Sequence, residues 1–139
     1  SYWPGVFQET AISRIEIPSS VRLLPRHCFY GCGSLREVYL PDQLTTICSG
    51  CFERSGIASL TVPRGLEEIE EDAFRDCEHL AEITLQTGGH IRKIGSGAFR
   101  GTPMHTLGPA DAVAKDAFDP DVCPETGRGK EVGKGLETV

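Results

Sequence analysis

Apolar residues recur along the chain in a fixed order, separated by polar stretches. A phenylalanine returns every 22 to 25 residues between Phe7 and Phe99, and Phe118 closes the series. Most of these phenylalanines precede a segment of the form LxxVxL, as in "LREVYL" at 35–40 and "LAEITL" at 80–85. The local alternation of apolar and polar positions predicts a short strand with one face inward. Equivalent positions therefore form columns, which is the signature of an internal repeat.

Three further features recur in most of the repeats. A proline follows the strand at Pro18, Pro41 and Pro63, where it lacks the amide that would continue a ladder of hydrogen bonds. A second apolar pair, as in "LEEI" at 66–69, predicts another short extended piece. The segment around each phenylalanine, such as "AFRDC" at 73–77, predicts a 3₁₀ or single helical turn that reverses the chain.

A unit of this size cannot bury its apolar edge alone, so successive units must stack. Stacking would turn each column of the sequence into a ladder through a common core, and the strands would form a parallel sheet. The aromatic column carries the largest of these side chains. Its members are Phe7, Phe29, Phe52, Phe74, Phe99 and Phe118. The sequence therefore predicts a solenoid with an aromatic ladder inside it.

The repeated pattern, approximately LxxIxIPxxVxxIxxxAFxxCxxL, resembles the BspA-like class of leucine-rich repeat over about residues 6–118. The resemblance implies a leucine-rich-repeat solenoid: a right-handed, β-rich coil with short parallel strands and 3₁₀ or single-turn helical segments. It also implies a chain that binds other macromolecules and has no catalytic centre. We expect residues 1–118 to form about five repeats, the first partial. The last repeat, with Pro109 at an apolar strand position, is expected to be a degenerate cap.

The two ends of the chain differ from the repeats. Tyr2 and Trp3 enter the first repeat with no strand before them, which predicts an exposed apolar edge that these side chains or another protein cover. Residues 119–139 contain four glycines and few large apolar side chains. This composition predicts a flexible tail, or one that a partner orders. Either end of the solenoid, or the tail, could therefore pack on another subunit.

Charge and composition narrow the classes of partner. The chain has 139 residues, with 14 basic and 20 acidic side chains and a net charge of −6. It lacks the basic surface that nucleic acid and anionic lipid select, so neither is an expected partner. No apolar run reaches the roughly 18 to 20 residues of a membrane span, and the first residues lack the pattern of a signal peptide. A cell-surface setting and an intracellular assembly both stay open.

Four cysteines occupy repeat positions that favour a small side chain. Cys28 and Cys51 directly precede a phenylalanine, where other repeats have alanine or valine. Cys32 and Cys77 follow three residues after one, where others have serine or threonine. Buried cysteine behaves as a small apolar residue, so packing accounts for all four, although a disulfide between Cys28 and Cys51 stays open. Cys48 stands at a variable position that we predict to be exposed.

A small zinc- or thiol-based protein is the alternative interpretation. The cysteines with a spacing close to that of a zinc ribbon are Cys28, Cys32, Cys48 and Cys51. Against this, alanine and serine serve equally well at the equivalent positions of other repeats. The acidic run "EEIEED" at 67–72 and the scattered histidines fit a solvated surface better than a cation site. We therefore predict no metal and no cofactor, and Cys123 in the tail has no assigned role.

A function must then come from the outward face of the predicted strands. The residues between the inward positions form two columns. They are Arg14, Glu37, Ser59 and Glu82 in one, and Glu16, Tyr39, Thr61 and Thr84 in the other. An aromatic side chain among charged ones, as at Tyr39, is typical of an interface anchor. We predict a non-enzymatic protein-binding or scaffold module, either an accessory subunit of a larger assembly or a surface adhesion-type repeat.

Overall fold

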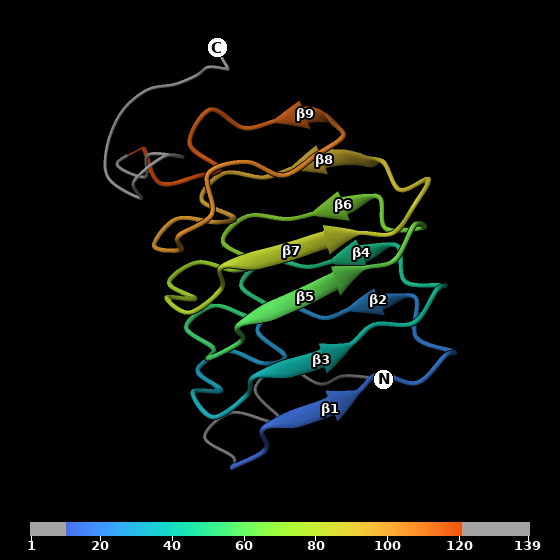
Figure 1. The fold of residues 1–139 in the computed structure, drawn as a ribbon, viewed down its shortest axis with the longest axis vertical. Helices are drawn as coiled ribbons and strands as arrows, with labels where there is room; N and C mark the ends of the chain where they lie inside the picture. Colours follow the sequence, from blue (N-terminus) through green and yellow to red (C-terminus); the bar gives the residue numbers. More distant parts are fainter. Residues whose placement is uncertain (1–10, 121–139) are drawn as a thin grey trace.

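The computed structural model describes residues 11–120, which wind into a coil of stacked turns. Each turn contributes one strand to a back sheet and, except in the last described turn, one to a front row (Figure 1). The front row contains β1 (Arg14–Glu16), β3 (Glu37–Tyr39), β5 (Ser59–Val62) and β7 (Glu82–Leu85). The back sheet contains β2 (Leu23–Leu24), β4 (Thr46–Ile47), β6 (Glu68–Ile69), β8 (Ile91–Ile94) and β9 (Ala110–Val113). The predicted solenoid of short parallel strands is confirmed.

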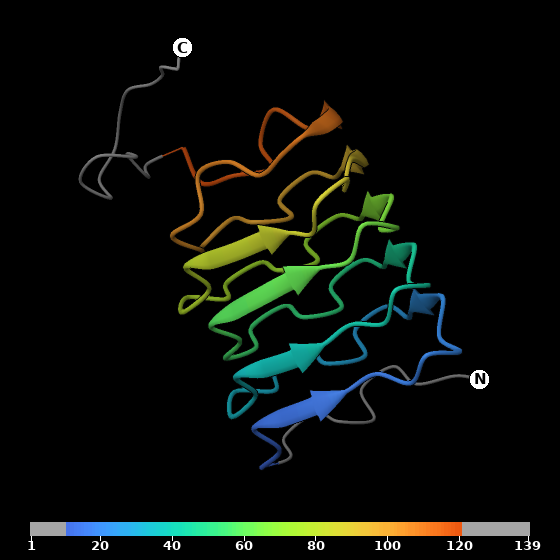
Figure 2. The ribbon, with the colours of Figure 1, turned by 45° about the vertical axis from the view of Figure 1, so that its right-hand side comes forward.

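The columns of the sequence become the register of the strands. Ile15 lies opposite Val38 in the pair of β1 and β3, and Leu60 lies opposite Ile83 in the pair of β5 and β7. All pairs of strands are parallel, and Figure 2 shows the front-row strands lying in order along the coil. No element between residues 11 and 120 is a helix long and apolar enough to cross a membrane.

The aromatic ladder runs through the core as the sequence predicts. Consecutive rings stack nearly parallel, with centroids 5.1 to 5.2 Å apart and interplanar angles of 5 to 8°. The described members of the ladder are Phe29, Phe52, Phe74, Phe99 and Phe118. All but the last are at most 1% exposed. Phe52, Phe74 and Phe99 therefore pack between rings of the coils on both sides, which ties neighbouring repeats together.

The front row is interrupted between β3 and β5. These strands do not pair as a ladder, so the row consists of two two-stranded sheets, although Ala58 N still donates to the carbonyl oxygen of Arg36 (3.2 Å). The expectation of one continuous front sheet is corrected accordingly.

The segments around the phenylalanines are not helical, contrary to the prediction of 3₁₀ or single helical turns. Their backbone amides alternate between two kinds of acceptor. Phe29 N donates to Cys51 O in the next coil (2.7 Å), whereas Tyr30 N donates to His27 O in its own coil (3.2 Å). Residues with φ between 57 and 79° stand two places before and two places after each of the first four described rings, and this left-handed conformation stops a helix from continuing. They are His27, Gly50, Asp72 and Gly97 before, and Gly31, Arg54, Asp76 and Gly101 after.

The last described turn is only half formed. β9 pairs with β8 in the back sheet, but no front-row strand forms over residues 104–109. Val113 continues the apolar column of Ile69 and Ile94, yet it is 43% exposed, because it is the last member of that column in the described residues. The predicted edge residues Tyr2 and Trp3, and most of the predicted tail, lie outside the described residues.

Candidate interaction surface

The residues predicted to face outward from the front row do so. We call them the front-face residues: Arg14, Glu16, Glu37, Tyr39, Ser59, Thr61, Glu82 and Thr84. All are exposed, and they alternate with inward residues along β1, β3, β5 and β7. Arg14 lies opposite Glu37 and Glu16 lies opposite Tyr39 in one pair of strands, and the other four residues pair in the same way. The structure thus brings the eight side chains onto one face in the two predicted columns.

Tyr39 is the large exposed side chain of this face, with 46% of its surface exposed. The guanidinium carbon of Arg14 lies 5.2 Å from the centre of its ring, at a distance suited to a cation–π interaction. The Tyr39 hydroxyl donates to Glu37 Oε1 (3.2 Å), and Arg14 Nε lies 3.6 Å from the same oxygen. These contacts are exposed and contribute little to stability, but they fix the orientation of the ring.

Two hollows flank the Tyr39 ring. One, of about 340 Å³, lies where the ladder is interrupted, between β3 and β5, and Gln86 lines its far side. The other, of about 580 Å³, lies beyond the carboxyl ends of β1 and β3, between Pro18 and Asp42. Tyr39 and Leu40 line both hollows, so the ring stands as a ridge between two depressions.

Sequence reasoning missed the residues that shape these hollows. Leu40, the last residue of the segment LREVYL, is half-buried and lines both depressions. Gln86 stands where other repeats have the proline after the strand, and its Oε1 accepts a hydrogen bond from Arg64 N (3.1 Å). The missing proline was a visible signal, but the interruption of the ladder that opens the hollow was not.

All five cysteines of the described chain are buried free thiols. They are Cys28, Cys32, Cys48, Cys51 and Cys77. The predicted exposure of Cys48 is wrong, since only 8% of this residue is exposed. The Glu70 side chain of the next coil lies close by and accepts a hydrogen bond from Ser49 N (3.1 Å). The position is variable in sequence but covered by the neighbouring coil. Cys28 and Cys51 are not bridged.

The thiols pack inside the core instead of converging on a metal. Cys77 Sγ donates to Phe52 O (2.9 Å) and lies 3.4 Å from Ser55 Oγ. The Cys77 thiol is therefore used in a hydrogen bond to the preceding coil. Within residues 11–120, no group of three or more His, Cys, Asp or Glu side chains is placed to hold a metal ion. The zinc alternative on Cys28, Cys32, Cys48 and Cys51 finds no support in this geometry.

Burial also lowers the reactivity of the thiols. It raises the pKa of Cys28 to about 12, with the Cys32 thiol adding to the effect. It raises the pKa of Cys32 and Cys77 to about 11 and that of Cys51 well above its ordinary value. For Cys48, burial and then the negative charges of nearby glutamates raise the pKa to about 11. Thiols of this kind stay protonated at neutral pH, and the protonated form is neither a nucleophile nor a metal ligand.

We expect these thiols to resist modification while the chain is folded. In a Cys123→Ser variant, which removes the cysteine outside the described residues, a disulfide reagent such as DTNB at pH 8 should react at least about 100-fold more slowly than in denaturing urea. The reason is that a rise in pKa from 9 to about 11 cuts the thiolate fraction at pH 8 about 100-fold. Stopped-flow absorbance at several pH values provides the measurement. A folded-state reaction whose rate rises with an apparent pKa of 8 to 9 would contradict the proposed burial.

Comparison with known proteins agrees with the fold. The BspA type leucine-rich repeat region matches residues 4–115 in six copies. The crystal structure of the pneumococcal vaccine antigen PcpA is similar, with a TM-score of 0.67 and 23% identity over 85% of this chain and 31% of that chain. A leucine-rich cell surface protein from Faecalibacterium prausnitzii has a TM-score of 0.60 and 19% identity over 83% of this chain and 41% of that chain.

The chain thus spans less than half the length of either of these proteins. Among curated proteins, none matches it in sequence. The family model covers most of the chain. The chain belongs to the BspA-type leucine-rich repeat family.

Proposed function

We propose that the chain is a non-enzymatic protein-recognition module that binds its partner through the front face. Membership of a leucine-rich repeat family supports a role in protein interaction in general. The observation that carries the proposal is the arrangement around Tyr39. An exposed aromatic ring is held in place by Arg14 and Glu37 and stands between two hollows. An aromatic side chain fixed before binding loses little entropy in the complex, which is a property of interface hot spots.

The rest of the front face suits the approach of a partner. Ser59, Thr61 and Thr84 are small, so a partner can approach the strands beside the Tyr39 ridge. Their hydroxyl groups can donate and accept hydrogen bonds at the rim of the interface. Glu16 and Glu82 add negative charge at the margins, where it affects the rate of association more than the affinity. We expect the partner to place side chains into the hollows on both sides of the ring.

Two forms of this function differ in where the protein is located. One is a surface adhesion-type repeat, and the other is an accessory subunit of a larger assembly. The two similar structures are described as a vaccine antigen and a cell surface protein, and those descriptions belong to those proteins. They make the cell surface the first setting to test. Labelling of intact native cells with an antibody against this chain should stain the surface, and labelling only after permeabilisation would favour the assembly.

The Tyr39→Ala substitution tests the proposed binding surface. A partner captured by the chain from its native source should bind the variant about 30-fold more weakly, the loss typical of a central aromatic anchor. Tyr39→Phe, which keeps the ring and loses only the hydrogen bond to Glu37, should lose much less. Surface plasmon resonance with the purified partner measures both.

Tyr30→Phe is the matched control, because Tyr30 is half-buried on a turn beside His27 and lies outside the front face. It should bind like the unmodified chain. Circular dichroism and thermal unfolding establish that each variant is folded. If Tyr39→Ala binds as tightly as Tyr30→Phe, the front face is not the recognition surface.

A further inference from the structure

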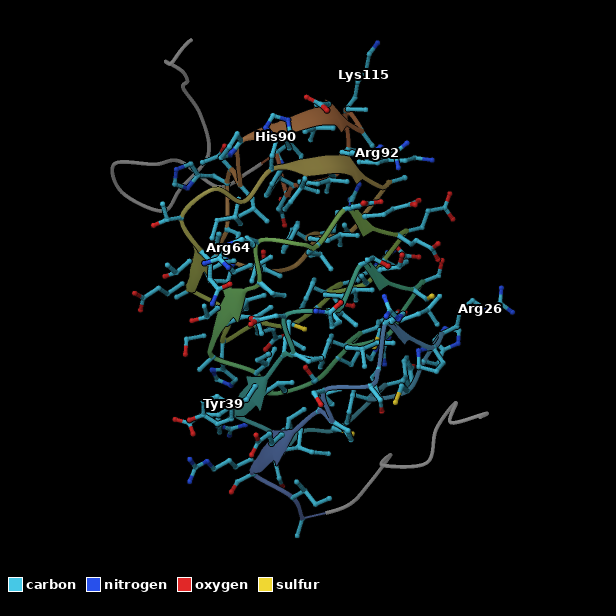
Figure 3. All side chains as sticks on the ribbon, turned by 90° about the vertical axis from the view of Figure 1, so that its right-hand side faces the viewer. Arg26, Tyr39, Arg64, His90, Arg92 and Lys115 are labelled. Carbon is cyan, nitrogen blue, oxygen red and sulfur yellow. The ribbon has the colours of Figure 1, made fainter. Side chains whose placement is uncertain are left out.

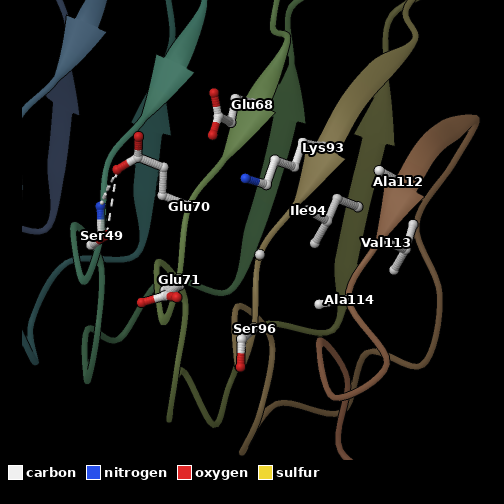
Figure 4. A pocket seen from close by; sticks show the side chains of 11 residues that line it. Ser49, Glu68, Glu70, Glu71, Lys93, Ile94, Ser96, Ala112, Val113 and Ala114 are labelled. Atoms are coloured by element: carbon white, nitrogen blue, oxygen red, sulfur yellow. Dashed lines mark hydrogen bonds between the residues drawn. The ribbon is translucent and has the colours of Figure 1, made fainter.

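A third hollow lies on the back sheet, which faces away from the Tyr39 ridge. Figure 3 shows Tyr39 and Arg92, a residue of β8, on opposite sides of the molecule. The hollow has a volume of about 460 Å³ and opens over β6, β8 and β9 (Figure 4). Its apolar lining consists of Ile94, Ala112, Val113 and Ala114. We call it the back-sheet hollow.

One column of residues that lines the back-sheet hollow changes from a long side chain in one coil to small ones in the next two. Ile69, Ile94 and Val113 lie in register on three successive strands, and the residues after them are Glu70, Gly95 and Ala114. A Cβ atom on Gly95 would lie 2.8 Å from the backbone nitrogen of Glu71. The close approach of two coils therefore requires glycine at this position.

Carboxylates form the wall opposite the apolar lining. Glu68, Glu70 and Glu71 line this side, and Lys93 stands between them and the lining. Among the described residues, neither Lys93 nor Glu68 nor Glu71 makes an ion pair within 4.0 Å. Three carboxylates against one ammonium leave an excess of two negative charges.

We propose that the back-sheet hollow binds the lysine or arginine side chain of a protein partner. The aliphatic stem of such a side chain would pack on Ala112 and Val113, which are the exposed apolar residues of the lining, and its cationic head would meet the carboxylates of Glu68 and Glu71. Lysine and arginine combine an apolar stem with a charged end, which matches a hollow with one apolar and one acidic wall. An anionic side chain would face a net repulsion, and a purely apolar one would leave the carboxylates unused.

Small peptides test this directly. The probes are four acetylated and amidated tripeptides, Gly-Lys-Gly, Gly-Arg-Gly, Gly-norleucine-Gly and Gly-Glu-Gly, added to the ¹⁵N-labelled full chain. The lysine and arginine peptides should shift the amide signals of 94–96 and 112–114 in a saturable way. The norleucine peptide, which keeps the stem without the charge, should bind about fivefold more weakly, and the glutamate peptide weaker still.

Substitutions separate the charge of the hollow from its shape. Glu68→Gln and Glu71→Gln should each weaken binding of the lysine peptide about two- to fivefold. Glu78→Gln is the control, since Glu78 is exposed and lines a different hollow, and it changes the net charge by the same amount. Ala112→Leu should abolish the shifts by filling the hollow from its exposed rim. The dispersion of the amide signals shows whether each variant is folded.

Three results would overturn the proposal. One is the absence of shifts at the back-sheet hollow with tens of millimolar lysine peptide. The second is equal binding of the lysine and norleucine peptides, and the third is a Glu68→Gln variant that behaves like Glu78→Gln. The Tyr39→Ala variant should bind the lysine peptide normally, so the back-sheet hollow and the front face can fail or succeed independently.

Discussion

Phe74→Ala should lower the free energy of unfolding by about 3 to 5 kcal/mol, the usual cost of removing a fully buried phenylalanine. Phe74 is 0% exposed and is stacked between Phe52 and Phe99, with centroid distances of 5.1 and 5.2 Å. Neighbouring coils are joined at this point by backbone hydrogen bonds, including Phe74 N to Ala98 O (2.8 Å), so they cannot close fully around the missing ring. Reversible urea unfolding followed by circular dichroism measures the loss.

Phe118→Ala provides the comparison within the same ladder. Phe118 is the last described rung, stacks on Phe99 at 5.1 Å and is only half-buried. Its removal should cost less than half as much, because a less buried ring leaves a smaller cavity. Equal losses for the two variants, or a loss below about 1 kcal/mol for Phe74→Ala, would show that the ladder does not hold the coils together.

The ladder could be predicted because it depends on spacing alone. Once Phe29, Phe52 and Phe74 recur at nearly constant intervals, stacking of the coils places the rings on top of one another. The same reasoning placed Tyr39 beside Glu16 and close to Arg14 on the front face, because register fixes which positions are neighbours. It could not give the hydrogen bond from Tyr39 to Glu37 or the hollows, since these depend on side-chain rotamers and on how neighbouring coils pack.

The turns were mispredicted because local propensity was read without the neighbouring coil. In each segment that was predicted to be helical, every second backbone amide donates to a carbonyl oxygen of the next turn. These hydrogen bonds between turns compete with the hydrogen bonds of a helix. A signal was present in the sequence. The two left-handed columns contain glycine or aspartate at Gly50, Asp72, Asp76 and Gly101, and these residue types adopt positive φ more readily than most.

The error at Cys48 arises because burial in a stacked coil depends on the next turn. Cys48 is variable between repeats, yet only 8% of it is exposed. Val113 shows the converse, since it belongs to an apolar column but no further coil lies beyond it in residues 11–120. The back-sheet hollow escaped the sequence for the same reason, because only superposed coils show which side chains line it.

Gly56→Ala should lower the free energy of unfolding by about 2 to 4 kcal/mol, through overpacking and the loss of hydrogen bonds to a charged group. Gly56 is buried where the guanidinium of Arg36 crosses between coils. Arg36 Nη1 donates to the carbonyl oxygens of Gly33 (2.7 Å), Leu35 (3.2 Å) and Gly56 (3.1 Å). A Cβ atom on Gly56 would overlap Arg36 Nη1 and Gly33 O and lie 2.9 Å from Leu35 O, so the backbone itself must shift.

Gly33→Ala is the matched control on the other side of the same guanidinium. A Cβ atom there meets nothing within 4 Å, so the variant should be neutral or gain up to about 1 kcal/mol from the stiffer unfolded chain. Urea unfolding of both variants under identical conditions gives the difference. Similar stabilities for the two would mean that the coils on either side of the interrupted ladder can separate freely. In that case the hollow beside Tyr39 would not have the fixed shape that the proposed recognition surface requires.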